Sequence, residues 1–337
     1  MGILNHALLG IMMSIGHRTG LFDRMSALGP SSPAEIAQAT ELDERYVREW
    51  LSAMVTGRIV DYDGRRGTYR LPAEHAASLT RTAGPNNLAI FMQVIAVYSG
   101  VEDDILECFK HGGGVPYERF HRFHDVCSEM SGTLHDDALV QRIVPAAGLT
   151  ERLTRGIDVL EVGCGKGHSL NLLAKAFPAS RFRGIDLCEE TVAGAREEVK
   201  KLGLGNVRFD REDAGKLDIV SAYDAITVFD AIHDQADPEG VLRRIRRALK
   251  PGGTLLCADI AASSNLADNL EHPLATALYS VSTLHFMTVS LAQGCAGLGS
   301  MCGQEKSLEL FATAGFPKVD VKRVEGDLMN NYYVAHV

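Results

Sequence analysis

The sequence has no excess of positive charge. It contains 34 lysine and arginine residues against 43 aspartate and glutamate residues, which gives a formal net charge of −9 at pH 7. Nucleic-acid binding depends largely on basic side chains that neutralise phosphates. The charge balance therefore argues against a wide phosphate-binding surface, although a local basic patch would still be compatible with it.

Paired cysteines are also missing. The seven cysteines are scattered, and no two of them form a Cys-x-x-Cys motif. This pattern argues against a disulfide framework and against a structural zinc site.

The apolar stretch at residues 1–20 has no basic leader and carries histidine and glycine in its middle, so it predicts neither a signal peptide nor a membrane span. We expect a cytoplasmic protein without a bound metal.

The chain is long for a single hydrophobic core. It has 337 residues, of which 46% are apolar and 23% are charged, so two domains are the default expectation. We predict an N-terminal domain over residues 1–84, a helical connector over 85–155 and a second domain over 156–337 with a helical insertion at about 261–300.

Residues 21–79 have the pattern of a winged helix. The sequence predicts three helices and two short strands, at 21–27, 33–39, 44–56, 58–61 and 68–71. A capping box formed by Ser32 and Glu35, with proline at the first helical position, marks the start of the second helix. The third helix has apolar residues at helical spacing, and these are expected to face inward: Tyr46, Val47, Trp50, Leu51 and Met54.

The third helix is where a DNA-binding winged helix places its base contacts. Its outward residues are Arg45, Arg48 and Glu49, but residues 31–70 hold six arginines against seven acidic residues. A winged helix of this charge is a poor DNA ligand, and the alternative is a domain that forms a dimer and covers a substrate pocket. The apolar N-terminal helix would then pair with a second subunit or pack within its own chain, through Leu8, Leu9, Ile11, Met12 and Ile15.

Residues 158–186 are the most informative part of the sequence. An apolar strand, a glycine turn, a helix and a second strand that ends in a carboxylate follow one another, which is typical of a nucleoside-binding βαβ unit. The glycines Gly163, Gly165 and Gly167 form E-x-G-x-G-x-G, whereas the dinucleotide fingerprint G-x-G-x-x-G requires a glycine where His168 stands. This spacing favours S-adenosylmethionine (SAM) over NAD.

The residue types of this turn suit a nucleoside that also carries an amino acid. Glycines allow the backbone to approach a ligand and to adopt positive φ. We expect Asp186 to accept hydrogen bonds from both ribose hydroxyls and Glu161 to meet the ligand's ammonium group, directly or through water. The alternative is a turn without a nucleotide, in which the glycines are incidental.

Strands and helices continue to alternate after residue 186. Strands are expected at 206–209, 225–229 and 254–260 and helices at 191–202 and 238–249, which predicts a parallel sheet. Two further segments, 318–324 and 332–337, are close enough to form an antiparallel hairpin. The helical insertion before them, which includes 275–291, is too long for an ordinary connection and is expected to cover the active site.

On these motifs, residues 157–337 resemble a class I SAM-dependent methyltransferase. The whole chain resembles the actinobacterial winged-helix methyltransferases often labelled transcriptional regulators and, more distantly, the plant-type small-molecule O-methyltransferases. The resemblance implies an α/β, Rossmann-like sheet of seven strands with a terminal antiparallel hairpin, and a SAM cofactor that is converted to S-adenosylhomocysteine (SAH). The cofactor contacts that it implies are Glu161, Gly163, Gly165, Gly167, Asp186, Leu187, Asp213, Ala214, Phe229 and Asp230.

His233 and Asp234 follow the fourth strand of the second domain, at the edge where open αβ sheets bind their ligands. An amino-group methylase of the Asp/Asn-Pro-Pro-Tyr type would have prolines here, and this chain has none. The pair resembles the His-Asp of plant-type O-methyltransferases, which implies that His233 is the general base and that Asp259 orients it. The second orienting position of that family falls near Met301.

A histidine with an ordinary pKa of about 6.5 is largely neutral at pH 7 and can accept a proton from the acceptor. The other interpretation of His233 is a residue that caps the helix after the fourth strand. Four further residues either line the acceptor pocket or belong to the core or surface: Tyr117, Phe120, His285 and Met287.

The leading hypothesis is a homodimeric SAM-dependent methyltransferase that acts on a small-molecule acceptor, at oxygen. The alternative is a SAM-binding transcriptional regulator, and a third possibility is a dimer partner without activity.

Overall fold

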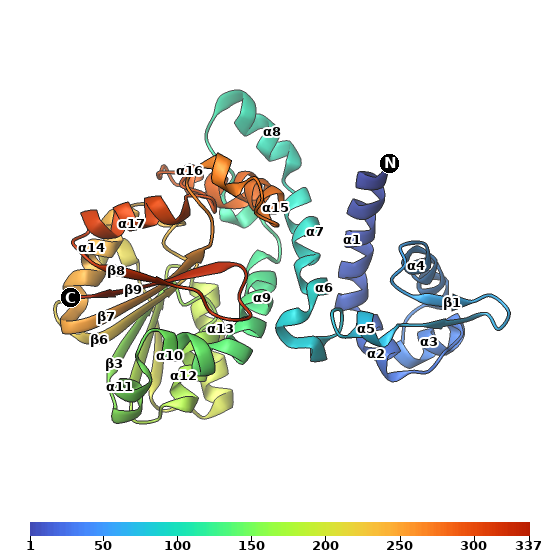
Figure 1. Cartoon of the computed structure of the whole chain (residues 1–337), viewed down its shortest axis with the longest axis horizontal. Coiled ribbons are helices and arrows are strands. Elements are labelled where there is room, and N and C mark those ends of the chain that lie inside the picture. Colours follow the sequence, from blue (N-terminus) through green and yellow to red (C-terminus); the bar gives the residue numbers. More distant parts are fainter. The chain divides into compact units, whose positions relative to one another are not determined.

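The computed structural model describes residues 1–337 and divides into two compact units (Figure 1). One unit comprises Met1–Gly100 and Asp125–Thr133, and the other comprises Val101–His124 and Leu134–Val337. The segment predicted as a connector, 85–155, is mostly helical and is divided between the two units. No helix of the chain is both long and apolar enough to cross a membrane.

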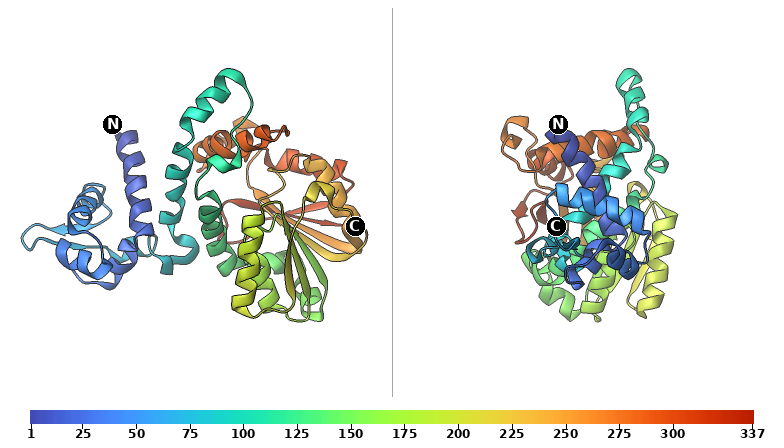
Figure 2. Two further views of the ribbon diagram at one scale, coloured as in Figure 1. Left: turned by 180° about the vertical axis from the view of Figure 1, so that it is seen from behind. Right: turned by 90° about the vertical axis from the view of Figure 1, so that its right-hand side faces the viewer.

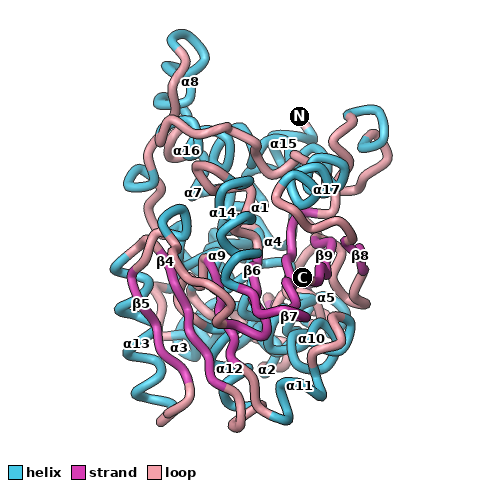
Figure 3. The backbone as a smooth tube through the Cα atoms, turned by 90° about the vertical axis from the view of Figure 1, so that its left-hand side faces the viewer, coloured by secondary structure: helices cyan, strands magenta, loops and turns pink.

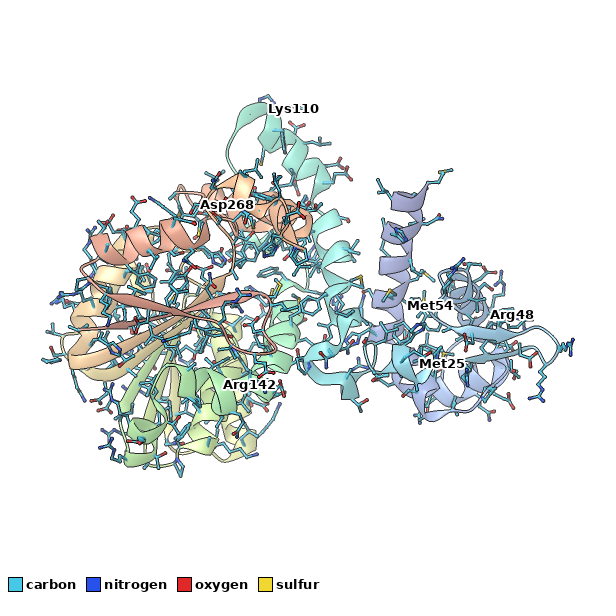
Figure 4. All side chains as sticks on the ribbon, in the orientation of Figure 1. Met25, Arg48, Met54, Lys110, Arg142 and Asp268 are labelled. Carbon is cyan, nitrogen blue, oxygen red and sulfur yellow. The ribbon has the colours of Figure 1, made fainter.

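The first unit contains the predicted winged helix. Its elements are α1 (Gly2–Arg18), α2 (Leu21–Ala27), α3 (Pro33–Thr40), α4 (Glu44–Thr56), β1 (Asp61–Asp63), β2 (Thr68–Arg70), α5 (Ala73–Ala76), η1 (Arg81–Asn86), α6 (Leu88–Phe91) and α7 (Gln93–Ser99). The Ser32 hydroxyl accepts from the Glu35 amide and the Glu35 carboxylate from the Ser32 amide, so the predicted capping box is present. Figure 4 shows Met25 and Met54 among these helices.

Two predictions for this unit are wrong in detail. The first wing strand begins at Asp61, three residues later than expected, because Arg58 adopts a left-handed φ of 59°. The amides of Ile59 and Val60 then donate to the carbonyl of Met54, so these residues form the exit from α4 and not a strand. Tyr46 was expected to face inward but is 80% exposed.

The helix α1 packs within its own chain along one face. Leu9 and Met12 lie against the apolar core of the unit, and the indole nitrogen of Trp50 donates to the carbonyl of Met12 over 2.8 Å. Leu8 and Ile15 remain exposed on the other face. The expected homodimer stays a prediction.

The second unit is built on a seven-stranded sheet in the order β5-β4-β3-β6-β7-β9-β8, which Figure 3 shows as a row of neighbouring strands. The strands are β3 (Asp158–Val162), β4 (Arg181–Asp186), β5 (Val207–Arg211), β6 (Tyr223–Phe229), β7 (Leu249–Ile260), β8 (Val319–Lys322) and β9 (Asn330–His336). The first five are parallel, and β9 runs antiparallel to both β7 and β8. The predicted seven-stranded sheet with a terminal antiparallel hairpin is confirmed.

Helices cover both faces of this sheet because side chains of a strand point alternately to either side. One face packs against α9 (Phe123–Ala138), η3 (Leu139–Ile143), α10 (Val144–Ala146), α11 (Thr150–Arg155), α12 (His168–Ala176) and α13 (Glu189–Leu202). The other face packs against α14 (Pro238–Ala248) and α17 (Gly303–Thr313). On β3, Val159 belongs to the first core, whereas Leu160 and Val162 belong to the second.

The predicted helical insertion lies between β7 and α17. It contains η5 (Leu266–Asn269), α15 (Ala275–Val281), the π-helical segment η6 (Ser282–Phe286) and α16 (Met287–Ala292). Figure 2 shows the insertion, in orange, beside the segment that connects α8 (Glu102–His111) to η2 (Tyr117–Arg119), in teal. The Val115 amide in this segment donates to the Thr288 hydroxyl over 2.9 Å.

Gly114 permits this close approach. A β-carbon at Gly114 would lie 1.9 Å from the carbonyl oxygen of Thr288 and 2.4 Å from the amide nitrogen of Ala292, both of which belong to the backbone of α16. The contact therefore holds the segment with Tyr117 and Phe120 against the insertion.

We predict that Gly114→Ala destabilises the second unit by about 1–3 kcal/mol, the usual range for an overpacked site. The reason is that helix backbone cannot yield as a side chain can. The control is Gly194→Ala, which lies at an exposed position of α13 with no atom within 4 Å of the new β-carbon and should stabilise the helix by about 0.5–1 kcal/mol. Urea unfolding of both variants measures the difference, and equal stability of the two would contradict the prediction.

Candidate active site

The glycine turn between β3 and α12 needs its three glycines for conformation. Gly163, Gly165 and Gly167 have φ values of 71°, 51° and 74°, which side chains rarely adopt. A β-carbon at Gly163 would lie 2.6 Å from that of Ala231, and one at Gly167 would lie 2.3 Å from the ring of Phe209. At Gly165 no atom lies within 4 Å of such a carbon. Gly165 is therefore the point of the turn that a ligand can approach.

Asp186 is fixed at the end of β4 by backbone donors. The Gly165 amide donates to one of its carboxylate oxygens and the Cys188 amide to the other, both over 2.9 Å. Each oxygen keeps further acceptor capacity, because a carboxylate has about four lone-pair positions. The carboxylate is thus oriented beside the open side of Gly165.

Glu161 lies behind the turn and is only 2% exposed. Its carboxylate accepts from the hydroxyl of Ser169, on the first turn of α12, over 2.5 Å and from that of Thr227, on β6, over 3.2 Å. Burial raises the pKa of Glu161 to about 7, although both hydroxyls lower it. Sequence reasoning identified the glutamate but not Ser169 or Thr227, which become visible only once the strand order is known.

The remaining residues expected to contact the cofactor follow β4, β5 and β6. Leu187 is 58% exposed directly after Asp186. The carboxylate of Asp213 accepts from the Gly215 amide over 2.8 Å and so begins the short helix η4 (Ala214–Lys216), in which Ala214 is buried. At the end of β6 the ring of Phe229 lies 4.9 Å from that of His135, a neighbour that the sequence did not indicate.

His233 lies in the turn after β6 and is 1% exposed. Its Nδ1 lies 2.7 Å from Oδ1 of Asp259, near the end of β7, and the same oxygen accepts from the Ile260 amide over 2.8 Å. Its Nε2 makes no hydrogen bond and lies 3.6 Å from Oδ1 of Asp234. The structure therefore brings together the histidine and the aspartate that the sequence assigned to catalysis.

Three carboxylates change the protonation of this histidine. Burial alone lowers the pKa of His233, but Asp259, Asp234 and Asp230 outweigh it and raise the pKa to about 10. The sequence-based assumption of an ordinary histidine pKa is wrong for this reason. Burial, assisted by Asp259, raises the pKa of Asp230 to about 7, and burial raises that of Asp234 to about 6.

Met301 does not contribute to this cluster. It is buried in a small apolar group with Ile260 and Leu278, where a thioether cannot orient a charged ring. Asp234, the residue that follows His233 in the chain, supplies a second carboxylate beside the imidazole instead.

Aromatic rings of the insertion and of the η2 segment form a connected cluster that reaches His233 through Phe286. The ring of Phe286 lies 5.0 Å from that of His233, in an edge-to-face arrangement. His285 is fully buried, and its ring stacks on Phe123 at 3.7 Å and meets Phe120 edge to face at 4.5 Å. Tyr117 donates to Asp234 over 3.4 Å. Met287 is half-buried at the start of α16.

His285 and Phe286 belong to the π-helical segment η6, an irregularity that is frequent at functional sites. Burial lowers the pKa of His285 to about 3, so this ring is neutral at physiological pH. The sequence analysis missed Phe286, because helical periodicity gives no sign of a π-helix.

Two family models match the chain over these two parts. The Rv2258c-like winged HTH domain matches residues 7–81, and a methyltransferase domain matches residues 153–315. The chain thus combines a winged HTH domain with a methyltransferase domain. Arg45 and Arg48 on α4 of the winged HTH domain form ion pairs with Glu49 and Glu44, four residues away, and Figure 4 shows Arg48 on the outside of this helix.

Curated relatives match the methyltransferase domain only in part. The arsenite methyltransferase of Aquipseudomonas alcaligenes is 34% identical over 128 residues, which cover 35% of this chain and 37% of the relative. The demethylmenaquinone methyltransferase of Listeria welshimeri is 33% identical over 110 residues, which cover 32% of this chain and 47% of the relative. The chain therefore spans less than half the length of these relatives.

Solved structures share the fold over nearly the full chain. Human N-acetylserotonin methyltransferase, in complex with SAM, has a TM-score of 0.69 and 19% identity, and the match covers 99% of this chain and 95% of that protein. At this identity the likeness establishes the fold alone. The predicted fold class, a class I methyltransferase sheet with a winged-helix domain, is confirmed.

We predict that Asp259→Asn lowers the pKa of His233 from its value of about 10, because it removes the strongest charge that favours the imidazolium. NMR titration of the ring carbon-bound protons measures this pKa directly. Asp268→Asn, an exposed position in the insertion, is the control and should leave the titration unchanged. A wild-type pKa near 6.5, or an unchanged pKa in Asp259→Asn, would contradict the electrostatic assignment.

Proposed function

We propose that this chain is a SAM-dependent methyltransferase that transfers a methyl group to an oxygen of a small-molecule acceptor, with His233 as the general base. The observation that carries the proposal is the arrangement at one edge of the sheet. A glycine turn that is open at Gly165 and the buried pair of His233 and Asp259 both lie at the carboxyl ends of the parallel strands β3, β6 and β7. Open αβ sheets bind their ligands at this edge.

The residues of the turn fit SAM. Open space beside Gly165 admits the ligand, and Asp186 has acceptor capacity for the two ribose hydroxyls. Burial raises the pKa of Glu161 to about 7, and an ammonium group nearby would favour the charged form of its carboxylate; its burial favours a contact through water over a direct one. Leu187, Asp213 and Ala214 are proposed to flank the adenine, and Phe229 and Asp230 the methionine end.

Bound SAM supplies a methyl group on a positively charged sulfur. The protein must hold the acceptor in line with that methyl group and remove the acceptor's proton. Nε2 of His233 is suited to the second task because Asp259 occupies Nδ1 and no hydrogen bond occupies Nε2. Asp259 fixes the ring orientation and stabilises the imidazolium that forms.

The raised pKa of His233 has a consequence for this role. A base must be neutral, whereas the carboxylates around His233 favour its protonated form in the absence of ligand. A cation bound among the same carboxylates competes with the imidazolium for them and lowers the pKa of the histidine. Cofactor binding is therefore expected to prepare the base.

The acceptor pocket is proposed to lie between His233 and the aromatic segments. Tyr117 and Phe120 come from the η2 segment, His285 and Phe286 from the π-helix, and Met287 from α16. Neutral rings and a thioether suit a partly apolar acceptor, and the Tyr117 hydroxyl adds a polar group to the pocket.

The winged HTH domain is proposed to serve dimerisation through the exposed side of α1 and not DNA binding, since Arg45 and Arg48 are already paired with acids.

We predict that methyl-labelled SAM transfers label to a component of a small-molecule extract, and that His233→Ala reduces the rate at least about 10²-fold, the lower range for loss of a positioned base. SAM affinity of this variant should persist, because the substitution leaves the glycine turn intact. Gly165→Ala should instead lose SAM binding, since its methyl group enters the open space and its φ of 51° is unfavourable for alanine.

The control for both variants is Gly194→Ala, at an exposed position of α13 where the new β-carbon meets no atom within 4 Å, and it should bind and react as wild type. Label transfer that survives in His233→Ala would remove this residue from the mechanism. Absence of SAM binding to wild type would refute the proposed function.

We predict that kcat/KM for the acceptor, measured with saturating SAM, still rises above pH 7, because only the neutral imidazole accepts a proton and the single charge of bound SAM offsets only part of the carboxylate charge around His233. The raised pKa of His233 places its neutral form on the alkaline side. Asp259→Asn should shift the rise toward lower pH while it reduces the maximal rate. A profile that is level above pH 7, where an ordinary histidine is already neutral, would contradict the prediction.

A further inference from the structure

Asp230 differs from the other carboxylates at this edge of the sheet. The carboxylates of Asp186, Asp234 and Asp259 each accept a hydrogen bond. The side chain of Asp230 makes no hydrogen bond and no ion pair, although solvent reaches the residue. Because the residue is exposed and its carboxylate has no protein partner, a ligand in the site can reach this carboxylate.

The position of Asp230 is between the two halves of the site. It follows β6 directly, and the register pairs Val228 with Val162 on β3, so that β6 ends beside the start of the glycine turn. The next residue, Ala231, lies so close to Gly163 that their β-carbons would be 2.6 Å apart. Asp230 thus directly precedes a residue that contacts the glycine turn, and His233 follows three residues further along the chain.

The backbone holds Asp230 in an unusual conformation. Its φ is 50°, in the left-handed region that aspartate tolerates better than most residues do. Its amide donates to the carbonyl of Ala258 on β7 over 3.1 Å, so the sheet itself fixes this conformation. The backbone therefore sets the direction of this side chain, and no side-chain partner is needed to hold it.

A second, independent group points to a ligand at the same place. Nε2 of His233 is buried, makes no hydrogen bond and faces Asp234 at 3.6 Å. Buried ring nitrogens rarely remain unsatisfied unless a ligand completes the site. Asp230 and Nε2 of His233 therefore belong to one incomplete polar centre.

We infer that Asp230 is the counter-ion of the sulfonium group of SAM, and that it makes the cleft prefer cationic SAM over its neutral product SAH. This inference rests on the proposed function, because it requires SAM in the glycine turn. It assigns to Asp230 a selection between substrate and product that an uncharged residue at this position would not provide.

The charge balance of the reaction agrees with this role. A lone pair of the acceptor oxygen forms the new bond to the methyl carbon, the electrons of the carbon–sulfur bond return to sulfur, and the acceptor proton passes to Nε2 of His233. The positive charge thus leaves sulfur and reaches the imidazole. Asp230 interacts with the charge of His233 as well, so this carboxylate faces a cation before and after the transfer.

The test compares the affinities of SAM and SAH by titration calorimetry in wild type, Asp230→Asn and Asp186→Asn. Asparagine keeps the size of aspartate and tolerates the left-handed conformation. We expect Asp230→Asn to reduce the preference for SAM over SAH at least about tenfold, which corresponds to about 1.4 kcal/mol. Asp186→Asn is the matched control. It removes a carboxylate that faces the neutral ribose, so it should weaken both ligands equally.

Two other results are informative. Equal effects of Asp230→Asn on SAM and SAH, or no effect on either, would overturn the inference. If wild type bound neither SAM nor SAH, the proposed function itself would be refuted. Asp230→Gly provides a second variant, since glycine removes the carboxylate and adopts φ of 50° without strain, and it should lose the SAM preference as Asp230→Asn does.

Discussion

The pair of His233 and Asp259 is the interaction on which the candidate site depends. Both side chains are buried, and 2.7 Å separates Nδ1 from the carboxylate. A buried ion pair gains little net stability because both charges lose water, but removal of one partner typically costs about 3–5 kcal/mol. The Ile260 amide also donates to this carboxylate. The backbone at the end of β7 therefore holds the aspartate in the position from which it orients the histidine.

The cofactor half of the site follows the same principle with different donors. Asp186 is held by two backbone amides, and Glu161 by two hydroxyls from neighbouring elements. In each case a strand or the turn after it supplies the carboxylate, and the adjacent chain supplies the donor. Rigid carboxylates of this kind present charge to a ligand without reorganisation, which is what a binding or catalytic site requires.

The sequence was sufficient for the elements whose ends are set by local chemistry. The bounds of α4 were predicted correctly, and in the structure Asp43 fixes its start by accepting from two amides of its first turn. The glycine turn was predicted from residue spacing, and its three positive φ values agree with that interpretation. The first wing strand was misplaced because Arg58 adopts a left-handed conformation. A glycine at this position would have indicated such a conformation in the sequence, but an arginine does not.

The remaining features depend on contacts between distant segments. The position of Phe286 against His233 follows from a π-helical turn that shifts the phase of the insertion helix, and periodicity of 3.6 residues cannot reveal such a shift. The pKa of His233 was misjudged because it depends on Asp230, Asp234 and Asp259 together. Asp230 and Asp234 lie close to His233 in the sequence. Asp259 comes near this histidine only because β6 pairs with β7.

Parallel strands explain why so many acids meet at one place. The carboxyl ends of β3, β4, β6 and β7 share one edge, so acids at or after these ends accumulate there whatever their separation in sequence. Backbone amides and hydroxyls stabilise most of these charges, and the imidazole of His233 offsets one more. Asp230 has no hydrogen bond or ion pair of its own and shares the charge of His233 with Asp234 and Asp259, so a cationic ligand would improve the charge balance at this edge. A sulfonium ligand would do so without any further basic residue, which agrees with a protein that has an overall acidic composition.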